Sequence, residues 1–404
     1  MSAGFVPPAY PHDRLASLAV TAAAHDGGVV DLSVGTPHDP PPPQVVAALA
    51  GSRAEQAYPP SIGSLALRRS ASAWLDRRLG VQVEPSSIAA CIGTKELVVG
   101  APHWLRLRDP SRDTVLYPAV SYPSYAMGAT LAGCRAVAVP LDERWRLDLD
   151  AVADDDVARA LCVWSNTPGN PAGGLDDLGA LGVWGRRHQV TVLSDECYVE
   201  YTWDGPRRSV LQAGVEGVIA VHSLSKRSNM AGLRAGFYAG DPELVTYLAE
   251  VRKHAGFMVP GPVQAAAAAA LDDDAHVDVQ ADRYRRRLER GRQILADAFG
   301  LDVAPPGGGF YLWVAVPGGD SWAFAARLAD EAGCLVAPGD FYGRHGAGHV
   351  RLALVVPEER LELVARRLGV GPPVPPPRSA PSLSGERSGS SSTVSSKRTG
   401  EPCS

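Results

Sequence analysis

Apolar residues in the middle of the chain come in short, uninterrupted runs separated by helical patterns. Such runs are typical of strands buried on both faces, as in parallel sheets whose connections are helices. The pattern predicts seven of these strands, at residues 88–92, 114–117, 136–139, 160–164, 191–193, 218–221 and 235–238. The predicted architecture is therefore α/β, with a large, mainly parallel sheet covered by helices on both faces.

The segments before this sheet alternate apolar and polar residues. Residues 29–35 predict a strand that stops at a glycine and a proline, and the prolines at 40–43 predict the start of a helix. Amphipathic helices are predicted at 15–24 and 65–79.

The segments after the sheet predict a second, smaller α+β unit. Residues 241–300 have a helical pattern that includes a charged helix at 281–299. Strands are then predicted at 310–316 and 349–354, with a helix at 322–332 between them.

These patterns divide the chain into four parts. Residues 1–40 are predicted to form an N-terminal arm and part of a small domain, 41–280 a large domain, and 281–370 the rest of the small domain. Residues 371–404 are rich in proline and serine, so they cannot bury enough apolar surface to offset the entropy of ordering. A disordered tail is predicted there.

Composition excludes several classes of protein. The 404 residues are 45% hydrophobic and carry a net charge of −5, so the chain has no basic field for nucleic acid or anionic membranes. No apolar run approaches the roughly 18 residues of a membrane span, and the first residues do not read as a signal peptide. The six cysteines form no C-x-x-C pair, so we expect reduced thiols in a cytoplasmic protein rather than zinc or disulfides.

Chemically useful side chains follow the ends of the predicted strands. In parallel sheets, ligands bind beyond the carboxyl ends of the strands. The residues found there are Thr94, Lys95, Tyr122, Asn166, Asn170, Asp195, Ser223 and Lys226. Their shared position predicts one binding site at this edge of the sheet.

Lys226 lies just after a buried strand, in a turn rich in serine and glycine. A lysine amine shielded from water loses its proton more readily and can form a Schiff base with a carbonyl group. Arg234 lies between Gly232 and Gly236, where the backbone can approach a ligand and the guanidinium can bind a phosphate. A cofactor with both a carbonyl and a phosphate is pyridoxal phosphate (PLP), although a solvated loop is the alternative for this stretch alone.

Thr94 and Lys95 open a predicted helix. The first turn of a helix has free N–H groups and a partial positive charge, which favour phosphate. With Ser223 and Arg234 these residues would complete a phosphate site. The alternative is an ordinary threonine cap with Glu96 in the first turn.

Asp195 ends a predicted strand, in a position to keep a pyridine nitrogen protonated so that the ring can withdraw electrons. Tyr198 and Asn170 can contact the phenolic oxygen of the same ring, and Tyr122 can stack on its face. Each also has a purely structural alternative, such as a turn aspartate or a packed tyrosine.

Arg351 lies within a predicted apolar strand, where an arginine is costly unless it is paired. A bidentate bond to a substrate carboxylate would satisfy it. A structural ion pair is the alternative.

The stretches Ser223-Leu-Ser-Lys226, Asn170-Pro-Ala-Gly and Asp195-Glu-Cys-Tyr198, with Arg234 and Arg351, together resemble the fold-type I, class I/II aminotransferases. The resemblance covers roughly residues 30–370, with Ala172 where many relatives have threonine. It implies a large PLP domain, a small domain built from both chain ends, and an active site shared across a homodimer. The implied substrates are an amino acid and a 2-oxo acid.

The resemblance also implies a role for each residue. Lys226, Asp195 and Tyr198 would be catalytic, with Lys226 bonded to PLP and moving the substrate proton. The implied cofactor contacts are Asp195, Tyr198, Asn170, Tyr122, Thr94, Lys95, Ser223, Lys226, Arg234 and, from the neighbouring subunit, Tyr58. The implied substrate contacts are Gly35, Asn170 and Arg351.

A narrower resemblance is to the succinyldiaminopimelate aminotransferases of high-GC bacteria, which serve lysine biosynthesis. It rests on the stretch that leads to Gly35 and Pro37 together with the stretch from Ser223 to Phe237. An aminotransferase for aspartate, glutamate or aromatic amino acids and a PLP-dependent C–S lyase are the alternatives. Lys95, Arg227 and the loop at 256–264 are candidates for contacting the far end of the substrate.

Overall fold

A computed structural model describes residues 4–54 and 56–372 of the chain. The tail predicted at 371–404 lies outside the described residues except for 371 and 372. None of the helices in the described ranges is long and apolar enough to cross a membrane.

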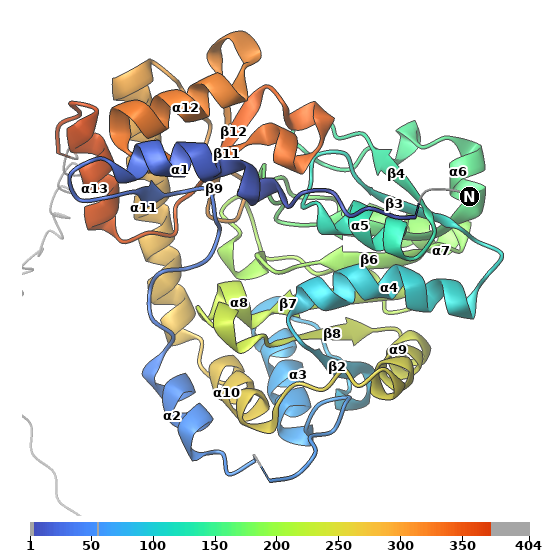
Figure 1. Cartoon of the computed structure of the whole chain (residues 1–404). Helices are drawn as coiled ribbons and strands as arrows, with labels where there is room; N and C mark the ends of the chain where they lie inside the picture. The colour runs from blue at the N-terminus through green and yellow to red at the C-terminus, as the bar shows by residue number, and fades with distance from the viewer. Residues whose placement is uncertain (1–3, 55, 373–404) are drawn as a thin grey trace, which may run out of the picture. The chain divides into compact units, whose positions relative to one another are not determined.

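The large sheet at the centre of Figure 1 contains all seven predicted strands. In spatial order they are β2 (Ile88–Cys91), β8 (Gly236–Gly240), β7 (Val218–Ser223), β6 (Thr191–Asp195), β5 (Ala160–Asn166), β3 (Thr114–Pro118) and β4 (Arg135–Val139). Strand β8 is antiparallel to both of its neighbours, and the other neighbouring pairs are parallel. The prediction of a mainly parallel sheet is confirmed.

The inner strands of this sheet and β2 are buried on both faces, which explains their uninterrupted apolar runs, whereas the edge strand β4 is largely exposed. In β2, Ile88 and Ala90 face one hydrophobic core, whereas Ala89 and Cys91 face the other. Helices α3 (Leu65–Leu79), α7 (Leu178–His188) and α10 (Gly261–Leu271) contribute to the first core. Helices α4 (Thr94–Arg108), α5 (Ser124–Leu131) and α9 (Pro242–His254) contribute to the second. Helix α2 (Pro43–Gly51) packs on α10 and begins within the predicted prolines.

A smaller antiparallel sheet has the order β11 (Ala337–Pro338), β12 (His349–Ala353) and β9 (Tyr311–Ala315). Apolar residues of this sheet form a separate core with α11 (Ala275–Phe299), α12 (Ser321–Ala332) and α13 (Glu358–Arg367). Strands β10 and β11 were not predicted, and α11 begins six residues before the predicted helix (281 − 275). The predicted boundary between a large and a small domain stays a prediction.

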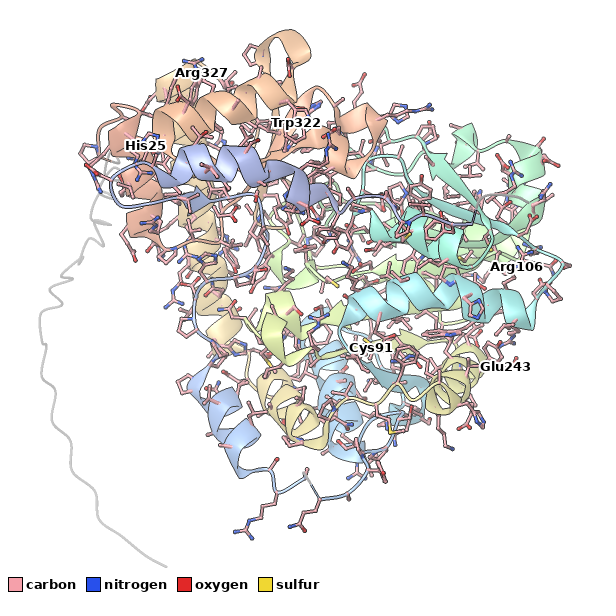
Figure 2. The ribbon with its side chains drawn as sticks, in the orientation of Figure 1. His25, Cys91, Arg106, Glu243, Trp322 and Arg327 are labelled. Atoms are coloured by element: carbon pink, nitrogen blue, oxygen red, sulfur yellow. The ribbon has the colours of Figure 1, made fainter. Side chains whose placement is uncertain are left out.

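The N-terminal segment runs beside these C-terminal elements. Helix α1 (Ala16–Ala23) packs on α12, and Figure 2 shows His25 and Trp322 on this side of the molecule. Strand β1 (Val30–Asp31) pairs in parallel with β10 (Cys334–Leu335).

The strand predicted at 29–35 is wrong in its length, because only two of its residues are in a strand. The carbonyl groups of Ser33 and Gly35 accept hydrogen bonds from the side chains of Arg351 and Lys226 instead of from a neighbouring strand. Side chains of the site have therefore taken the place of a strand ladder in this segment.

Candidate active site

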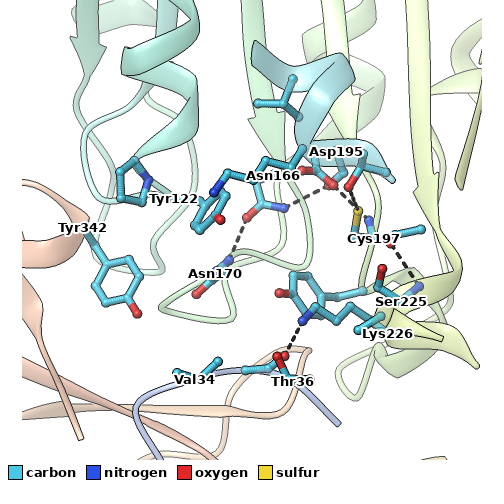
Figure 3. Close-up of a pocket in the computed structure, with 18 of the residues that line it drawn as sticks. Val34, Thr36, Tyr122, Asn166, Asn170, Asp195, Cys197, Ser225, Lys226 and Tyr342 are labelled. Carbon is cyan, nitrogen blue, oxygen red and sulfur yellow. Dashed lines mark hydrogen bonds between the residues drawn. The ribbon is translucent and has the colours of Figure 1, made fainter. Parts of the chain in front are cut away.

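A cavity of about 500 Å³ lies between the large sheet and the small sheet. On one side it is lined by Asn166, Asp195 and Ser223, which are the last residues of β5, β6 and β7. On the other side it is lined by Tyr311 of β9 and Arg351 of β12. Figure 3 shows Asp195, Asn166 and Tyr122 across the cavity from Tyr342. The site therefore lies at the carboxyl edge of the parallel strands, as predicted.

Lys226 lies in α8 (Leu224–Arg227), a single helical turn that follows β7 directly. The hydroxyl of Tyr201 donates to the carbonyl oxygen of Lys226 at 3.1 Å, which holds the backbone of this turn. The amine donates to the carbonyl oxygen of Gly35 across the cavity (Figure 3). Burial and the positive charge of Arg351 lower the pKa of Lys226 to about 8. With this pKa about a tenth of the amine is neutral at pH 7, far more than for a lysine with the ordinary pKa, which suits a nucleophile.

Asp195 is buried and is the only acidic side chain among the described residues that line the cavity. The hydroxyl of Tyr125 donates to its carboxylate at 2.8 Å, and the backbone N–H of Cys197 donates at 3.2 Å. Burial raises the pKa of Asp195, whereas the hydrogen bonds from Cys197 and Tyr125 lower it. The carboxylate thus has two fixed donors and can still accept a proton-bearing group from the cavity.

The N-terminus of α4 and the side chain of Arg234 meet at one end of the cavity. Helix α4 begins at Thr94 and leaves its first N–H groups free for an anion. A Cβ atom at Gly93 would lie 2.1 Å from Nη2 of Arg234, so the arginine can cross the helix start only because this residue is glycine. Ser223 and Ser225 add hydroxyl groups to the lining of the cavity. This donor set fits a phosphate.

Tyr198 and Asn170 contact partners from the small sheet. The hydroxyl oxygens of Tyr198 and Tyr311 are 2.8 Å apart, and both side chains are buried. The side-chain oxygen of Asn170 accepts a hydrogen bond from Nη1 of Arg351 at 2.8 Å. These contacts link the cofactor side of the cavity to the side predicted to bind the substrate.

Arg351 is 3% exposed and has no carboxylate within 4.0 Å among the residues that the structure describes. Its Nη2 donates to the carbonyl oxygen of Ser33 at 2.5 Å, and its Nε has no hydrogen-bond partner in this part of the chain. The guanidinium carbon lies 4.3 Å from the ring centre of Tyr311 and 5.0 Å from that of Tyr342. The structural ion pair considered from the sequence is therefore not found, and the cation faces the cavity.

Comparison with known proteins identifies the family. Residues 27–368 match the family described as "Aminotransferase class I and II". The chain belongs to the class I and II aminotransferases. The resemblance stated from the sequence is confirmed at this level, and so are the fold type and the use of PLP, the cofactor of this family.

The relatives of this aminotransferase are not all named for the same substrate. It is 43% identical to the 4-dedimethylamino-4-oxo-anhydrotetracycline transaminase OxyQ of Streptomyces rimosus, over 89% of this chain and 99% of the relative. It is 44% identical to the probable aminotransferase Rv1178 of Mycobacterium tuberculosis, over 89% of this chain and 85% of the relative. The solved structure of a probable N-succinyldiaminopimelate aminotransferase from Thermus thermophilus has a TM-score of 0.79 and 33% identity, and covers 89% of this chain and 99% of that chain.

The residues of the cavity fit PLP. Asp195 is available for the ring nitrogen, the start of α4 with Arg234 for the phosphate, and Lys226 for the aldehyde carbon. Arg351 is not used by any of these contacts and is left for a substrate. The lining thus offers a group for the ring nitrogen, for the phosphate and for the aldehyde of the cofactor.

The structure places eleven of the twelve predicted site residues in the lining of this one cavity. They are Gly35, Thr94, Lys95, Tyr122, Asn170, Asp195, Tyr198, Ser223, Lys226, Arg234 and Arg351. Tyr58 does not line it, and its side chain is 96% exposed in the single chain. The roles assigned to these residues stay predictions.

Of the three candidates for the far end of the substrate, only Lys95 lines the cavity. The prediction for Arg227 is wrong, because its side chain points away from the cavity into a buried cluster with Glu200 and Asp274. Residues of the 256–264 loop do not line the cavity of their own chain.

Several lining residues were not assigned a role from the sequence. They include Tyr10 and His12 of the N-terminal arm, Tyr125, Ser225, Tyr311 and Tyr342. Tyr125 carries a local signal, since it lies one helical turn after Tyr122 at the start of α5. Tyr311 has no such local signal, because an aromatic residue in an apolar strand is typical of the hydrophobic core.

Proposed function

We propose that this aminotransferase exchanges an amino group between N-succinyl-LL-2,6-diaminopimelate and 2-oxoglutarate, with glutamate as donor in the biosynthetic direction of lysine synthesis. The cytoplasmic location and the homodimer expected from the sequence belong to the same proposal. The observation that carries it is Arg351, a buried cation that faces the cavity without a carboxylate of its own among the described residues. An α-carboxylate of an amino or 2-oxo acid would supply the missing charge with two parallel hydrogen bonds.

The cavity as a whole favours acidic substrates. Lys226 and Arg234 are assigned to PLP, which leaves Arg351 and Lys95 as the cations of the lining that can meet a substrate. Asp195, the one carboxylate among the described lining residues, is assigned to the ring nitrogen. The amine of Lys95 lies 4.9 Å from the ring centre of Tyr10 and 5.6 Å from that of Tyr122, with no carboxylate within 4.0 Å among the described residues. A substrate with a second carboxylate, such as the succinylated diamine or 2-oxoglutarate, would match this charge.

The residues of the chain divide the work of the reaction between them. PLP, when bound, would delocalise the electron pair that stays on the substrate α-carbon when its proton is removed. Lys226 is placed to accept that proton and return it, because its amine reaches across the cavity to Gly35. Asp195 and Tyr122 line the cavity, where Asp195 would keep a proton on the ring nitrogen and Tyr122 would cover the ring. Tyr198 and Asn170 donate to the phenolic oxygen.

A shared active site is part of the proposal. Tyr58 is exposed in the single chain, which fits a side chain that reaches the phosphate of a second subunit. Analytical ultracentrifugation together with Tyr58→Ala tests this role. We expect a dimer with weaker cofactor retention in the variant, and a monomer that retains full activity would contradict it.

A second candidate is amino transfer to a bulky cyclic ketone. The name of OxyQ, at 43% identity, describes a transaminase of an anhydrotetracycline ketone. The aromatic lining of the cavity by Tyr10, Tyr122, Phe341 and Tyr342 favours a flat, extended substrate. Such a ketone has no α-carboxylate, so in this function Arg351 would contact only the amino donor.

A panel of amino donors decides between these functions. Purified protein with PLP is assayed with 2-oxoglutarate and the succinylated diamine, aspartate, glutamate, phenylalanine or a thioether amino acid, and separately with glutamate and a tetracyclic ketone. We expect the highest kcat/KM with the succinylated diamine, and no turnover by Lys226→Ala. Preference for the ketone would assign the second function, and pyruvate from the thioether without transamination would assign a C–S lyase.

A further inference from the structure

We propose that Tyr311 is a positioning residue that joins the two halves of the site, with its hydroxyl directed at Tyr198 and its ring supporting Arg351. The inference rests on the proposed function, because it assigns Tyr198 to the phenolic oxygen of PLP. Tyr311 belongs to β9 of the small sheet, whereas Tyr198 follows β6 of the large sheet. One side chain thus contacts a residue expected to bind the cofactor and one expected to bind the substrate.

The hydroxyl of Tyr311 is shielded from water and has one partner. Its oxygen lies 2.8 Å from that of Tyr198, and the two side chains are 1% and 6% exposed. The rings meet edge to face, with centroids 5.6 Å apart. Bulk water could not replace this hydrogen bond if it were lost. The loss should therefore change the hydrogen bonding of Tyr198 measurably.

The direction of the hydrogen bond follows from what Tyr198 must do. A phenol has one proton to donate and can accept with its lone pairs. If Tyr198 donates to the phenolic oxygen of PLP, its own oxygen is left to accept the proton of Tyr311. A donor that itself accepts a hydrogen bond becomes polarised and donates more strongly. Tyr311 therefore strengthens the contact that Tyr198 makes.

The ring of Tyr311 serves the second half of the site. The guanidinium carbon of Arg351 lies 4.3 Å from its ring centre, which is close enough for a cation–π interaction. Tyr342 also faces Arg351, at 5.0 Å, but its buried hydroxyl has no hydrogen-bond partner in the described residues. Only Tyr311 of these two contacts both Arg351 and Tyr198.

Gly35 lets this hydroxyl approach the backbone from a third direction. A Cβ atom at Gly35 would lie 2.1 Å from the hydroxyl oxygen of Tyr311. The carbonyl of the same glycine accepts from Lys226. The absence of a side chain at residue 35 thus lets the tyrosine and the lysine approach the same backbone segment.

The test is the pKa of the Schiff base between Lys226 and PLP, read from its visible absorption band during a pH titration. A hydrogen bond to the phenolic oxygen stabilises its negative charge and weakens its hold on the Schiff-base proton, so weaker donation raises this pKa. For Tyr311→Phe, which keeps the ring, we expect a rise of about half a unit. Tyr342→Phe is the matched control and should leave this pKa unchanged.

The decisive comparison is to introduce Tyr311→Phe into a protein that already carries Tyr198→Phe. Because the hydroxyl of Tyr311 acts through Tyr198, Tyr311→Phe should cause no further shift in the pKa once Tyr198 is phenylalanine. An equal shift in both backgrounds, or no shift in the wild type, overturns the proposal. A wild-type protein without a titrating band would instead contradict the proposed function, so the two failures can be told apart.

The ring is tested separately through KM. Tyr311→Phe should leave KM for the amino donor unchanged, whereas Tyr311→Leu, which removes the aromatic face, should raise KM about fivefold. Equal KM values for the two variants would remove the assigned support of Arg351.

Discussion

Arg227 and Arg351 are both buried arginines, but their surroundings are opposite. Arg227 is 4% exposed and lies 3.2 Å from a carboxylate oxygen of Glu200 and 2.9 Å from one of Asp274. Arg351 is 3% exposed and is held by two neutral oxygens and two aromatic faces. The first charge is neutralised within the protein, and the second is not.

The difference separates a structural cation from a ligand-binding one. A buried charge is tolerated when it is paired and hydrogen-bonded. Arg227 meets that condition without a ligand and therefore serves the fold, although it is the neighbour of Lys226 in the sequence. Arg351 is paired with an opposite charge only when an anion enters the cavity. We expect substitutions at the two positions to affect different properties of the protein.

Arg351→Met should cause the largest effect, on activity alone. Loss of a desolvated, bidentate carboxylate contact should lower kcat/KM for amino acid donors by about 1,000-fold. The melting temperature should stay the same or rise, because an uncompensated buried charge is removed. Steady-state kinetics and calorimetry measure both. Arg351→Lys should recover only part of the activity, since an ammonium cannot form the two parallel bonds.

Arg227→Met should act in the opposite sense. It removes the buried cation between Glu200 and Asp274. Because Glu200 keeps its contacts with Trp74 and Arg78, and Asp274 keeps its ion pair with Arg77, the loss is partly compensated. The free energy of unfolding should therefore fall by about 2 kcal/mol. Urea denaturation measures this change. Under conditions where the variant is folded, KM for the donor should be close to that of the wild type. A raised KM with unchanged stability would place Arg227 in the site and remove the distinction drawn here.

The charge of Arg351 should also be visible at Lys226. Because the neutral amine is the nucleophile and its pKa is about 8, the rate at which PLP attaches to the cofactor-free protein should rise about 50-fold from pH 6 to pH 8 and then level off. An Nα-acetyl-lysine control, with its ordinary pKa near 10.4, should still accelerate above pH 9. In Arg351→Met the levelling should shift to higher pH, since one of the charges that lower the pKa is gone.

Arg234 also lines the cavity without a carboxylate within 4.0 Å among the described residues. It therefore offers a smaller test of the view that an unpaired arginine of the cavity binds a ligand. In Gly93→Ala the new methyl group would displace Arg234, and the backbone at φ +67° would be strained. We expect the dissociation constant of PLP to rise about tenfold. Gly232→Ala is the control, because a Cβ there meets no atom within 4 Å. Equal affinity in both variants would show that Arg234 does not hold the phosphate.

The sequence could predict a site residue when its role depends on neighbours in the sequence, and could not when its role depends on distant parts of the chain. Lys226, Asp195 and Asn170 lie at or just after strand ends. Apolar runs and the turn residues that follow them locate strand ends well. The helix at 65–79 was predicted to the residue, since its apolar stripe, serine cap and terminal glycine are all local. Strand β1 was predicted too long, because the carbonyl groups beyond it accept hydrogen bonds from Arg351 and Lys226. These partners lie 318 and 191 residues away from them in the chain.

The alternation of apolar runs and helical stretches, by itself, determined a mainly parallel sheet with a reactive carboxyl edge, because buried strands must be apolar at every position. The motifs around Asn170, Asp195 and Lys226 carried the resemblance to the family, since each motif is read along the chain. Only the tertiary structure decided which of two buried arginines lacks an acid and that Tyr311 contacts Tyr198. Charge compensation and hydrogen bonding depend on neighbours in space, and those neighbours come from both ends of the chain.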